Sequence, residues 1–145
     1  MTEQIIAYGG SVEMSIDSGT TWRNVVEAKS LPVPTIAQEY LDATSLDSPD
    51  GYREYIKGLK DLGELTMTQG YSADAWSQML AANALNGPTM FRVTMALQPS
   101  QTTTGDVFEF SGYPTPSLEA NDVGAIVGMT TTIRTTGAVT WTRGS

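Results

Sequence analysis

The chain has 145 residues, a formal net charge of −8 from 16 acidic and 8 basic side chains, and neither His nor Cys. With 40% apolar and 17% charged residues, it has the composition of one globular domain with a hydrophobic core. The missing residue types exclude a disulfide framework, a thiol nucleophile, a cysteine-type zinc site and imidazole chemistry, and the net charge argues against tight binding to nucleic acid.

Alternation of apolar and polar residues predicts β-strands along most of the chain. In the first strand, Val12, Met14 and Ile16 share one face, and residues 17–20 then predict a hairpin turn. The same alternation predicts further strands at residues 22–27, 35–41, 64–71, 91–98, 108–110, 125–133 and 139–141.

One segment, at about residues 72–86, has the period of a helix instead. Ser72 is a suitable N-cap, and residues 86–88, Asn-Gly-Pro, would end the helix. The apolar residues at the spacing of one helical face are Trp76, Met79, Leu80 and Ala84. One helix among seven or eight strands predicts a mainly β fold, a two-sheet β-sandwich or partial barrel with one flanking helix, in a single domain over residues 1–145.

A long insertion at about residues 42–63 lies between two of the predicted strands, so a β-loop-β element is expected there. Residues 42–64 hold 9 of the 24 charged residues, together with two tyrosines and four large aliphatic side chains. Connections of this length are usually functional or disordered, and this one is too rich in aromatic and apolar residues to be merely disordered. Its residues 52–59 also match one face of a helix, although Gly58 would weaken it.

Two interpretations of this insertion remain open. The first is a compact Ω-loop folded back on its own sheet. The second is an arm that buries its tyrosines and aliphatic side chains against a neighbouring subunit, with its charges setting the register between copies. The candidate residues of this inter-subunit arm are Leu46, Asp47, Asp50, Tyr52, Arg53, Glu54, Tyr55, Ile56, Lys57, Leu59 and Lys60.

The same stretch resembles a known family. Its sequence runs Leu41-Asp-Ala-Thr-Ser-Leu-Asp-Ser and, after Pro49 and Asp50, Gly51-Tyr-Arg-Glu-Tyr-Ile-Lys-Gly-Leu-Lys-Asp-Leu-Gly-Glu-Leu-Thr. It is similar to the central segment of the major tail (tail tube) proteins of bacteriophages with long, non-contractile tails. The likeness covers about residues 40–71, and the order of the predicted elements extends it along the chain.

The resemblance implies a β-sandwich with one helix, assembled as six copies per ring and as stacked rings that form a hollow tube. It implies a structural, non-enzymatic virion protein, made in the host bacterial cytoplasm, that needs no cofactor. Its expected partners are further copies of itself, tail-tip or tape-measure proteins and tail terminator proteins. Because the chain ends at Ser145, we expect the tube-forming core without the C-terminal immunoglobulin-like domain that some family members carry.

An acidic chain is suited to a channel through which double-stranded DNA passes without being held. A duplex carries one negative charge per roughly 1.7 Å, so basic walls would retain it. The candidate lumen-facing residues are Gln38, Glu39, Glu64, Thr66, Thr68, Thr130, Thr132 and Arg134. The alternative is that these residues form the solvent face of a monomer, and a negative charge also keeps any soluble protein dispersed.

Other classes of function are weighed against this hypothesis. Glycoside hydrolysis needs only a pair of carboxylates, but Glu13, Asp17, Glu39 and Glu109 lie in no recognisable motif. Residues 47–51 look like a metal loop, yet they lack the acid that calcium-binding loops carry at their twelfth position, and a turn is expected instead.

Two non-enzymatic alternatives remain. One is a monomeric β-sandwich module that binds a carbohydrate or a cell surface through Trp22 or Trp141, and the other is the inner-tube protein of a contractile injection or secretion system. Membrane insertion is not expected, because Glu3 stands where a signal peptide carries a base and no apolar run approaches the roughly 20 residues that span a bilayer.

Overall fold

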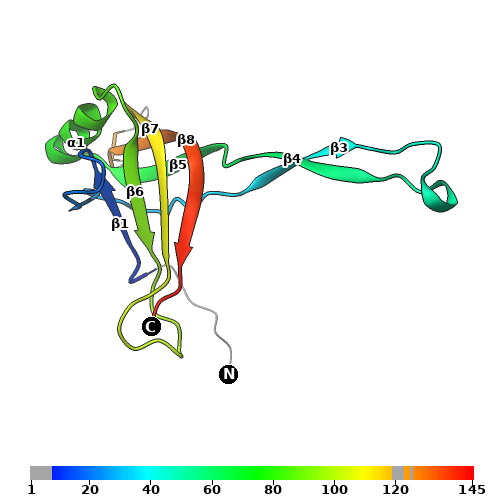
Figure 1. The fold of residues 1–145 in the computed structure, drawn as a ribbon. Helices are drawn as coiled ribbons and strands as arrows, with labels where there is room; N and C mark the ends of the chain where they lie inside the picture. Colours follow the sequence, from blue (N-terminus) through cyan, green and yellow to red (C-terminus); the bar gives the residue numbers. More distant parts are fainter. Residues whose placement is uncertain (1–7, 119–122, 125) are drawn as a thin grey trace.

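The computed structural model describes residues 8–118, 123–124 and 126–145. A curled six-stranded antiparallel sheet, with strands in the order β2-β1-β6-β7-β8-β5, forms the body of the molecule (Figure 1). Its strands are β1 (Ser11–Ser15), β2 (Arg23–Asn24), β5 (Glu64–Gly70), β6 (Thr89–Thr94), β7 (Val107–Leu118) and β8 (Gly128–Thr142). The helix α1 (Ala73–Asn83) packs against β7 on one face of this sheet.

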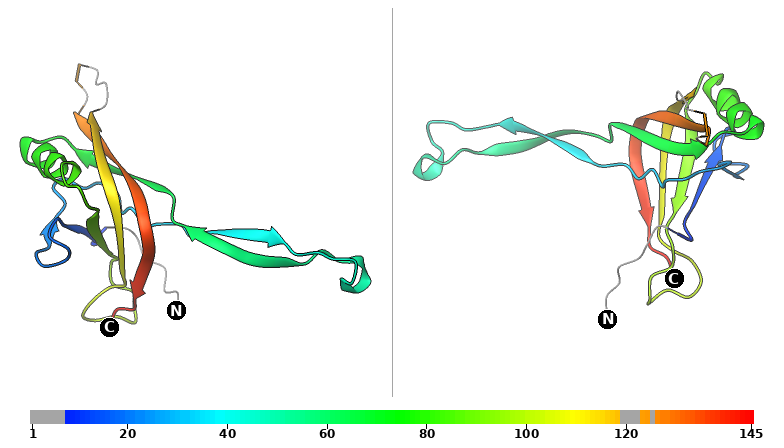
Figure 2. Two further views of the ribbon diagram at one scale, coloured as in Figure 1. Left: turned by 45° about the horizontal axis from the view of Figure 1, so that its top comes forward. Right: turned by 180° about the vertical axis from the view of Figure 1, so that it is seen from behind.

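A second, two-stranded sheet projects from the body as a long hairpin (Figure 2). It consists of β3 (Ala37–Asp42) and β4 (Tyr55–Asp61), and a single 3₁₀ turn, η1 (Pro49–Gly51), lies in the connection between them. The predicted mainly β fold with one helix is therefore confirmed, with the main sheet curled as a half-barrel.

Several predicted strands have different limits in the structure. The two strands predicted at residues 125–133 and 139–141 are one strand, β8, and its Gly137 adopts a φ of +80° close to a register shift against β7. Of the strand predicted at residues 22–27, only the two residues of β2 are in the sheet. Ala125, which was assigned to a predicted strand, lies outside the described residues.

The helix forms where the sequence predicts it. The Oγ atom of Ser72 accepts a hydrogen bond from the N–H of Ala75 at 3.1 Å, as expected of an N-cap. The buried face is Ala75, Met79 and Ala82, whereas Leu80, which was expected on that face, is exposed. Small alanine side chains allow the helix to approach β7 closely, and Asn83 Nδ2 then donates to the Pro114 carbonyl at 2.9 Å.

The hydrophobic core fills the space between the main sheet and α1. Phe91 on β6 and Phe110 on β7 stack at its centre, with ring centroids 5.6 Å apart. Met67, Met129 and Ile133 from the neighbouring strands are fully buried around them. The long unbranched methionines fit the irregular space that a curled sheet leaves below a single helix.

We expect Phe91→Ala to lower the free energy of unfolding by about 3–5 kcal/mol, because the fully buried ring would leave a cavity and Phe110 would lose its stacking partner. Denaturant unfolding followed by circular dichroism would measure this loss. Phe108→Ala is the matched control, since Phe108 is only partly buried and should lose less stability. Equal losses from both variants would contradict this placement of the core.

Candidate functional site

The hairpin of residues 37–61, called the arm from here on, reaches away from the body and contacts the main sheet at its base, where Asp61 pairs with Arg134 of β8 (Figure 1). The structure therefore excludes the Ω-loop interpretation of the insertion. The expected helical face at residues 52–59 is also wrong, because residues 55–61 form strand β4. Gly58 fits the strand, since the side chain of Glu39 on β3 occupies the space next to it.

The apolar side chains of the arm are exposed to an unusual degree. Leu46 near the tip is fully exposed, and Leu59 in β4 is 82% exposed. The other exposed large side chains of the arm are Tyr40, Leu41, Tyr52, Tyr55 and Ile56. So many exposed apolar side chains on one projecting element are typical of a contact site for another molecule.

The register of β3 against β4 assigns these side chains to two opposite faces. Leu41 pairs with Ile56, so both lie on one face, which we call the aliphatic face. Tyr40 pairs with Lys57 and Asp42 pairs with Tyr55, so these four lie on the opposite face, which we call the tyrosine face.

The tip of the arm is ordered by its own polar groups. Asp42 accepts from the N–H of Thr44 at 2.8 Å and pairs with Arg53 at 3.1 Å. Thr44 Oγ1 accepts from the N–H of Glu54 at 2.8 Å, and Ser48 Oγ donates to the Glu54 carboxylate at 3.2 Å. The predicted arm residues Arg53 and Glu54 thus shape the tip, while Asp50 takes a positive φ in the turn.

The hydroxyl and the N–H of Thr44, with a smaller contribution from Arg53, lower the pKa of Asp42 below its ordinary value of 3.8. The charged carboxylate therefore stabilises the tip above pH 3.8, and this contribution is lost as the pH falls through the lowered pKa. We expect the protection of the amides of residues 44–54, measured relative to their intrinsic exchange rates at each pH, to fall on that acid side before the body unfolds. In Asp42→Asn the same amides should exchange faster at neutral pH and show no such acid step.

A polar face of the main sheet forms the second candidate surface, on the side opposite α1. Exposed polar residues on β5, and half-buried threonines on β8, alternate with buried residues. Glu64, Thr66 and Thr68 pair with Arg134, Thr132 and Thr130 respectively. Six of the eight candidate lumen residues thus lie side by side. The other two, Gln38 and Glu39, lie on β3 of the arm.

Strand β7 adds polar residues to this face that the sequence analysis did not name. Tyr113, Thr115 and Ser117 pair with Arg134, Thr132 and Thr130, and all three are exposed. In the sequence analysis this strand ended at residue 110, because Pro114 and Pro116 interrupt the alternation of apolar and polar residues that follows. The resulting surface is a broad layer of hydroxyl groups.

The polar face continues onto β6 through Arg92, which pairs with Glu109 of β7, so it carries two arginines, Arg92 and Arg134. Both arginines lie beside carboxylates. Arg92 pairs in register with Glu13 on one side and Glu109 on the other, and its guanidinium binds both carboxylate oxygens of Glu13 at 3.2 and 3.0 Å. Arg134 approaches Asp61 at 3.4 Å. The N–H of Gly63, together with Arg134, holds the pKa of Asp61 below its ordinary value. Neither guanidinium is therefore an isolated positive charge.

Trp22, one of the two candidate stacking platforms for a carbohydrate, is already engaged. The guanidinium of Arg92 lies 4.2 Å from its ring centroid, so the same arginine holds both Trp22 and Glu13. Trp141 at the end of β8 is about half exposed.

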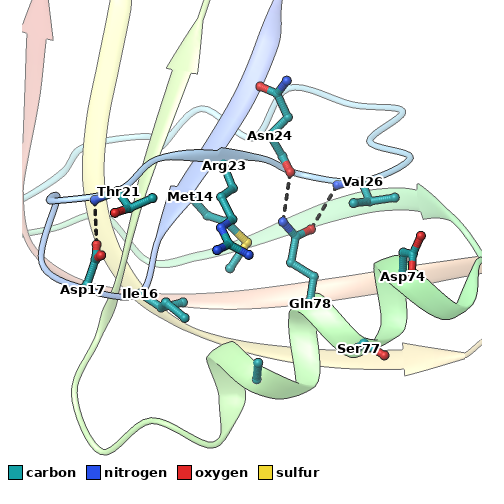
Figure 3. Close-up of a pocket in the computed structure, with 11 residues that line it drawn as sticks. Met14, Ile16, Asp17, Thr21, Arg23, Asn24, Val26, Asp74, Ser77 and Gln78 are labelled. Carbon is teal, nitrogen blue, oxygen red and sulfur yellow. Dashed lines mark hydrogen bonds between the residues drawn. The ribbon is translucent and has the colours of Figure 1, made fainter.

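A cavity of about 760 Å³ lies between α1 and the β1–β2 connection (Figure 3). Ile16, expected in the core, is instead half exposed on its wall. Asp17 accepts from the N–H of Thr21 at 2.8 Å in the predicted turn, and this bond lowers the pKa of Asp17. Within the described ranges, no group of three or more acidic residues is placed to hold a metal ion.

Gln78 of α1 closes the outer edge of the main sheet in this cavity (Figure 3). Its Oε1 accepts from the N–H of Val26 at 3.0 Å, and its Nε2 donates to the carbonyl of Asn24 at 2.9 Å. The amide thus takes the place of a neighbouring strand. At the opposite edge, residues 27–30 cover the end of β5, where Lys29 N–H donates to Thr68 O and Gly70 N–H donates to Glu27 O.

In the part of the chain that the structure describes, no helix is long and apolar enough to cross a membrane. No protein-family model matches the chain, and no curated protein matches it by sequence.

The fold is shared with components of tail and baseplate particles. A chain of the anti-feeding prophage (AFP) baseplate superposes with a TM-score of 0.72 and 8% identity, over 99% of this chain and 98% of that chain. A chain of the tail of an empty GTA particle, computed with helical refinement in C6 symmetry, gives 0.71 and 14% identity, over 96% and 99% of the two chains.

A third similar chain comes from the PVC sheath/tube terminator of an extracellular contractile injection system in its extended state. Its TM-score is 0.70 at 14% identity, with 96% of each chain covered. One description names a contractile system and none names a non-contractile tail. The comparisons therefore support the tail fold, and not the narrower family of non-contractile tails.

Proposed function

We propose that this protein is a structural, non-enzymatic tail-tube subunit, whose single tail-tube domain polymerises into stacked rings of six copies. The tube would be a conduit for double-stranded DNA and part of a virion or a virion-like particle, assembled in the cytoplasm of the host bacterium. Its partners would be further copies of itself, with tail-tip or tape-measure and terminator proteins at the two ends.

The observation that carries the proposal is the arm. A two-stranded hairpin is at best marginally stable in water, and this one exposes seven large apolar or aromatic side chains along its length. Such a segment needs a partner surface, and the arm and α1 lie on opposite sides of the body (Figure 2). A contact between different surfaces of identical subunits is heterologous, and its repetition produces rings or helical tubes.

The polar face supports the conduit. Glu13, Arg92, Glu109, Glu64 and Arg134 give it a net charge of −1 per subunit, and its arginines already have carboxylate neighbours. Retention of a duplex requires cations that neutralise phosphates, and this surface offers hydroxyl groups instead. A bore of this composition would be wetted and would let DNA slide.

The inner tube of a contractile injection system is the second candidate. The similarity to the PVC terminator, which belongs to a contractile system, favours it. A sheath around the tube in micrographs of the parent particle would decide for the contractile system, and a bare tube would decide for the non-contractile tail.

Negative-stain imaging of the concentrated, purified protein tests the proposal directly. We expect rings or hollow tubes, with size-exclusion chromatography showing species far larger than a single chain. A protein that stays monomeric at high concentration, and also in the presence of a tail-tip complex, would refute the tube function.

A further inference from the structure

The arm is joined to the body by two short segments, and both are anchored in the hydrophobic core. Leu62, which follows β4, is 7% exposed and belongs to the core. On the other side, Pro32 is buried and Val33 packs against the core before β3 begins. Because the ring of Pro32 fixes its backbone φ and Leu62 is buried, neither segment is a flexible linker. The direction of the arm is therefore decided within a few residues of its root.

Hydrogen bonds among Asp61, Gly63 and Thr135, called the collar from here on, surround this root. The Gly63 N–H donates to Asp61 Oδ1 at 3.0 Å, and the Gly63 carbonyl accepts from the Thr135 N–H at 3.2 Å. The Thr135 hydroxyl donates to the same carbonyl. Both backbone groups of Gly63 are thus held, one by the end of the arm and the other by β8.

Packing alone leaves the root room to move toward β8. A hollow of about 460 Å³ lies between the root, at Ile36 and residues 60–62, and residues 135–139 of β8. Ile36 on its wall is 54% exposed. Close-packed interiors resist displacement, but no close-packed layer fills this side of the root. The hydrogen bonds of the collar, and not apolar contacts, therefore hold the arm on this side.

Thr135 is the collar residue whose bonds are best shielded from water. It is 6% exposed, so water competes little for its hydroxyl. The side chain of Asp61 is 59% exposed, and exposed ion pairs such as its pair with Arg134 contribute little. Thr135 also stands in a buried row of β8 with the apolar Met129 and Ile133. A buried hydroxyl in such a row needs a partner, and the Gly63 carbonyl is that partner.

The length of the arm magnifies any tilt at its root. Strand residues rise about 3.3 Å each, so the stretch from Ala37 to Leu46 spans roughly 30 Å and a tilt of about 10° moves the tip by about 5 Å. We infer that Thr135 is a positioning residue for assembly, because its hydroxyl, bonded to Gly63, fixes the direction of the arm in the free subunit. This role rests on the proposed polymerisation. An arm that is already oriented loses less conformational freedom when copies associate.

Distance measurements on the free subunit test the inference. The chain has no cysteine, so Leu46→Cys near the tip and Thr140→Cys on β8, both at exposed positions, take two spin labels without background. Double electron–electron resonance at a concentration that keeps the protein monomeric then reports the spread of the tip-to-body distance. We expect one narrow distribution with the native collar, and one at least about twice as wide in Thr135→Val, which loses only the hydroxyl bond.

Two substitutions serve as controls. Thr135→Ser retains a hydroxyl and should restore the narrow distribution. Thr136→Val makes the same change at the adjacent, exposed position and should leave the width unchanged. In chains without labels, Thr135→Val should raise the critical concentration for tubes about tenfold, and Thr135→Ser should not.

Equal widths with the native collar and in Thr135→Val would overturn the inference, and so would a wider distribution with an unchanged critical concentration. Absence of tubes from the unmodified protein would instead refute the proposed function, while the distances would still decide whether Thr135 orients the arm. If circular dichroism shows that Thr135→Val does not fold, Gly63→Ala releases the same carbonyl. Its methyl group meets no atom within 4 Å but disfavours the φ of +73°, so the distribution should widen.

Discussion

Replacing Ile56 by Asp is expected to abolish polymerisation while leaving the subunit folded. Ile56 is 56% exposed in the free subunit, so a carboxylate there remains hydrated and the fold does not change. In a tube the same carboxylate would be buried without a partner, at a cost of several kcal/mol per contact. Because about 1.4 kcal/mol corresponds to a factor of ten, we expect the critical concentration to rise at least about 100-fold.

Sedimentation and negative-stain imaging would measure this loss of assembly, with circular dichroism melting as the test of folding. Ile56→Val keeps an apolar side chain and is the control that should still assemble. Tyr55→Ala, on the opposite face of the arm, should also prevent assembly. If Ile56→Asp instead abolished the melting transition, Ile56 would belong to the stability of the single subunit.

The second large effect is expected on the polar face. In the double variant Glu13→Gln/Glu109→Gln, Arg92 loses the two carboxylates that flank it, and the charge of the face changes from −1 to +1 per subunit. Repeated around and along a tube, these cations would neutralise successive phosphates. We expect open-ended tubes of this variant to retain duplex DNA at low salt and to release it steeply as salt increases.

Co-sedimentation of a duplex with tubes at a series of salt concentrations would measure the effect. The triple variant Glu13→Gln/Glu109→Gln/Arg92→Gln loses the same acids without a free guanidinium, so its tubes should behave as the unmodified ones do. Tubes of the double variant that retain no DNA at low salt would show that this face does not line the bore.

Local sequence patterns were sufficient for most of the main sheet and for the helix. Val12 and Met14 alternate because one side of β1 is buried, and Ser72 caps α1 through its own hydroxyl. The insertion was predicted as a β-loop-β element, but the limits of strand β4 were not predicted, for a physical reason. Both faces of the arm are exposed in the free chain, so its sequence has none of the apolar–polar contrast that burial of one face imposes.

Which charged residues meet on the polar face is decided by the order of the strands in the sheet. A local sequence pattern does not encode that order. Glu13 and Arg92 are 79 positions apart and meet only because β1 and β6 are neighbours in the sheet. The threonines of β5 and β8 were identified because each strand alternates by itself. The sequence could therefore indicate the hydroxyl groups of this surface, but not the carboxylates that flank its arginines.

The amide of Gln78 has a consequence for how crowded copies of this chain behave. Exposed strand edges can recruit one another indiscriminately, and amyloid-like precipitation is the usual result. Gln78 already bonds the outward backbone groups of Asn24 and Val26. A strand of another chain therefore cannot pair with the main sheet at this edge. The protein can accordingly reach a high concentration without aggregating through the β2 edge of its sheet.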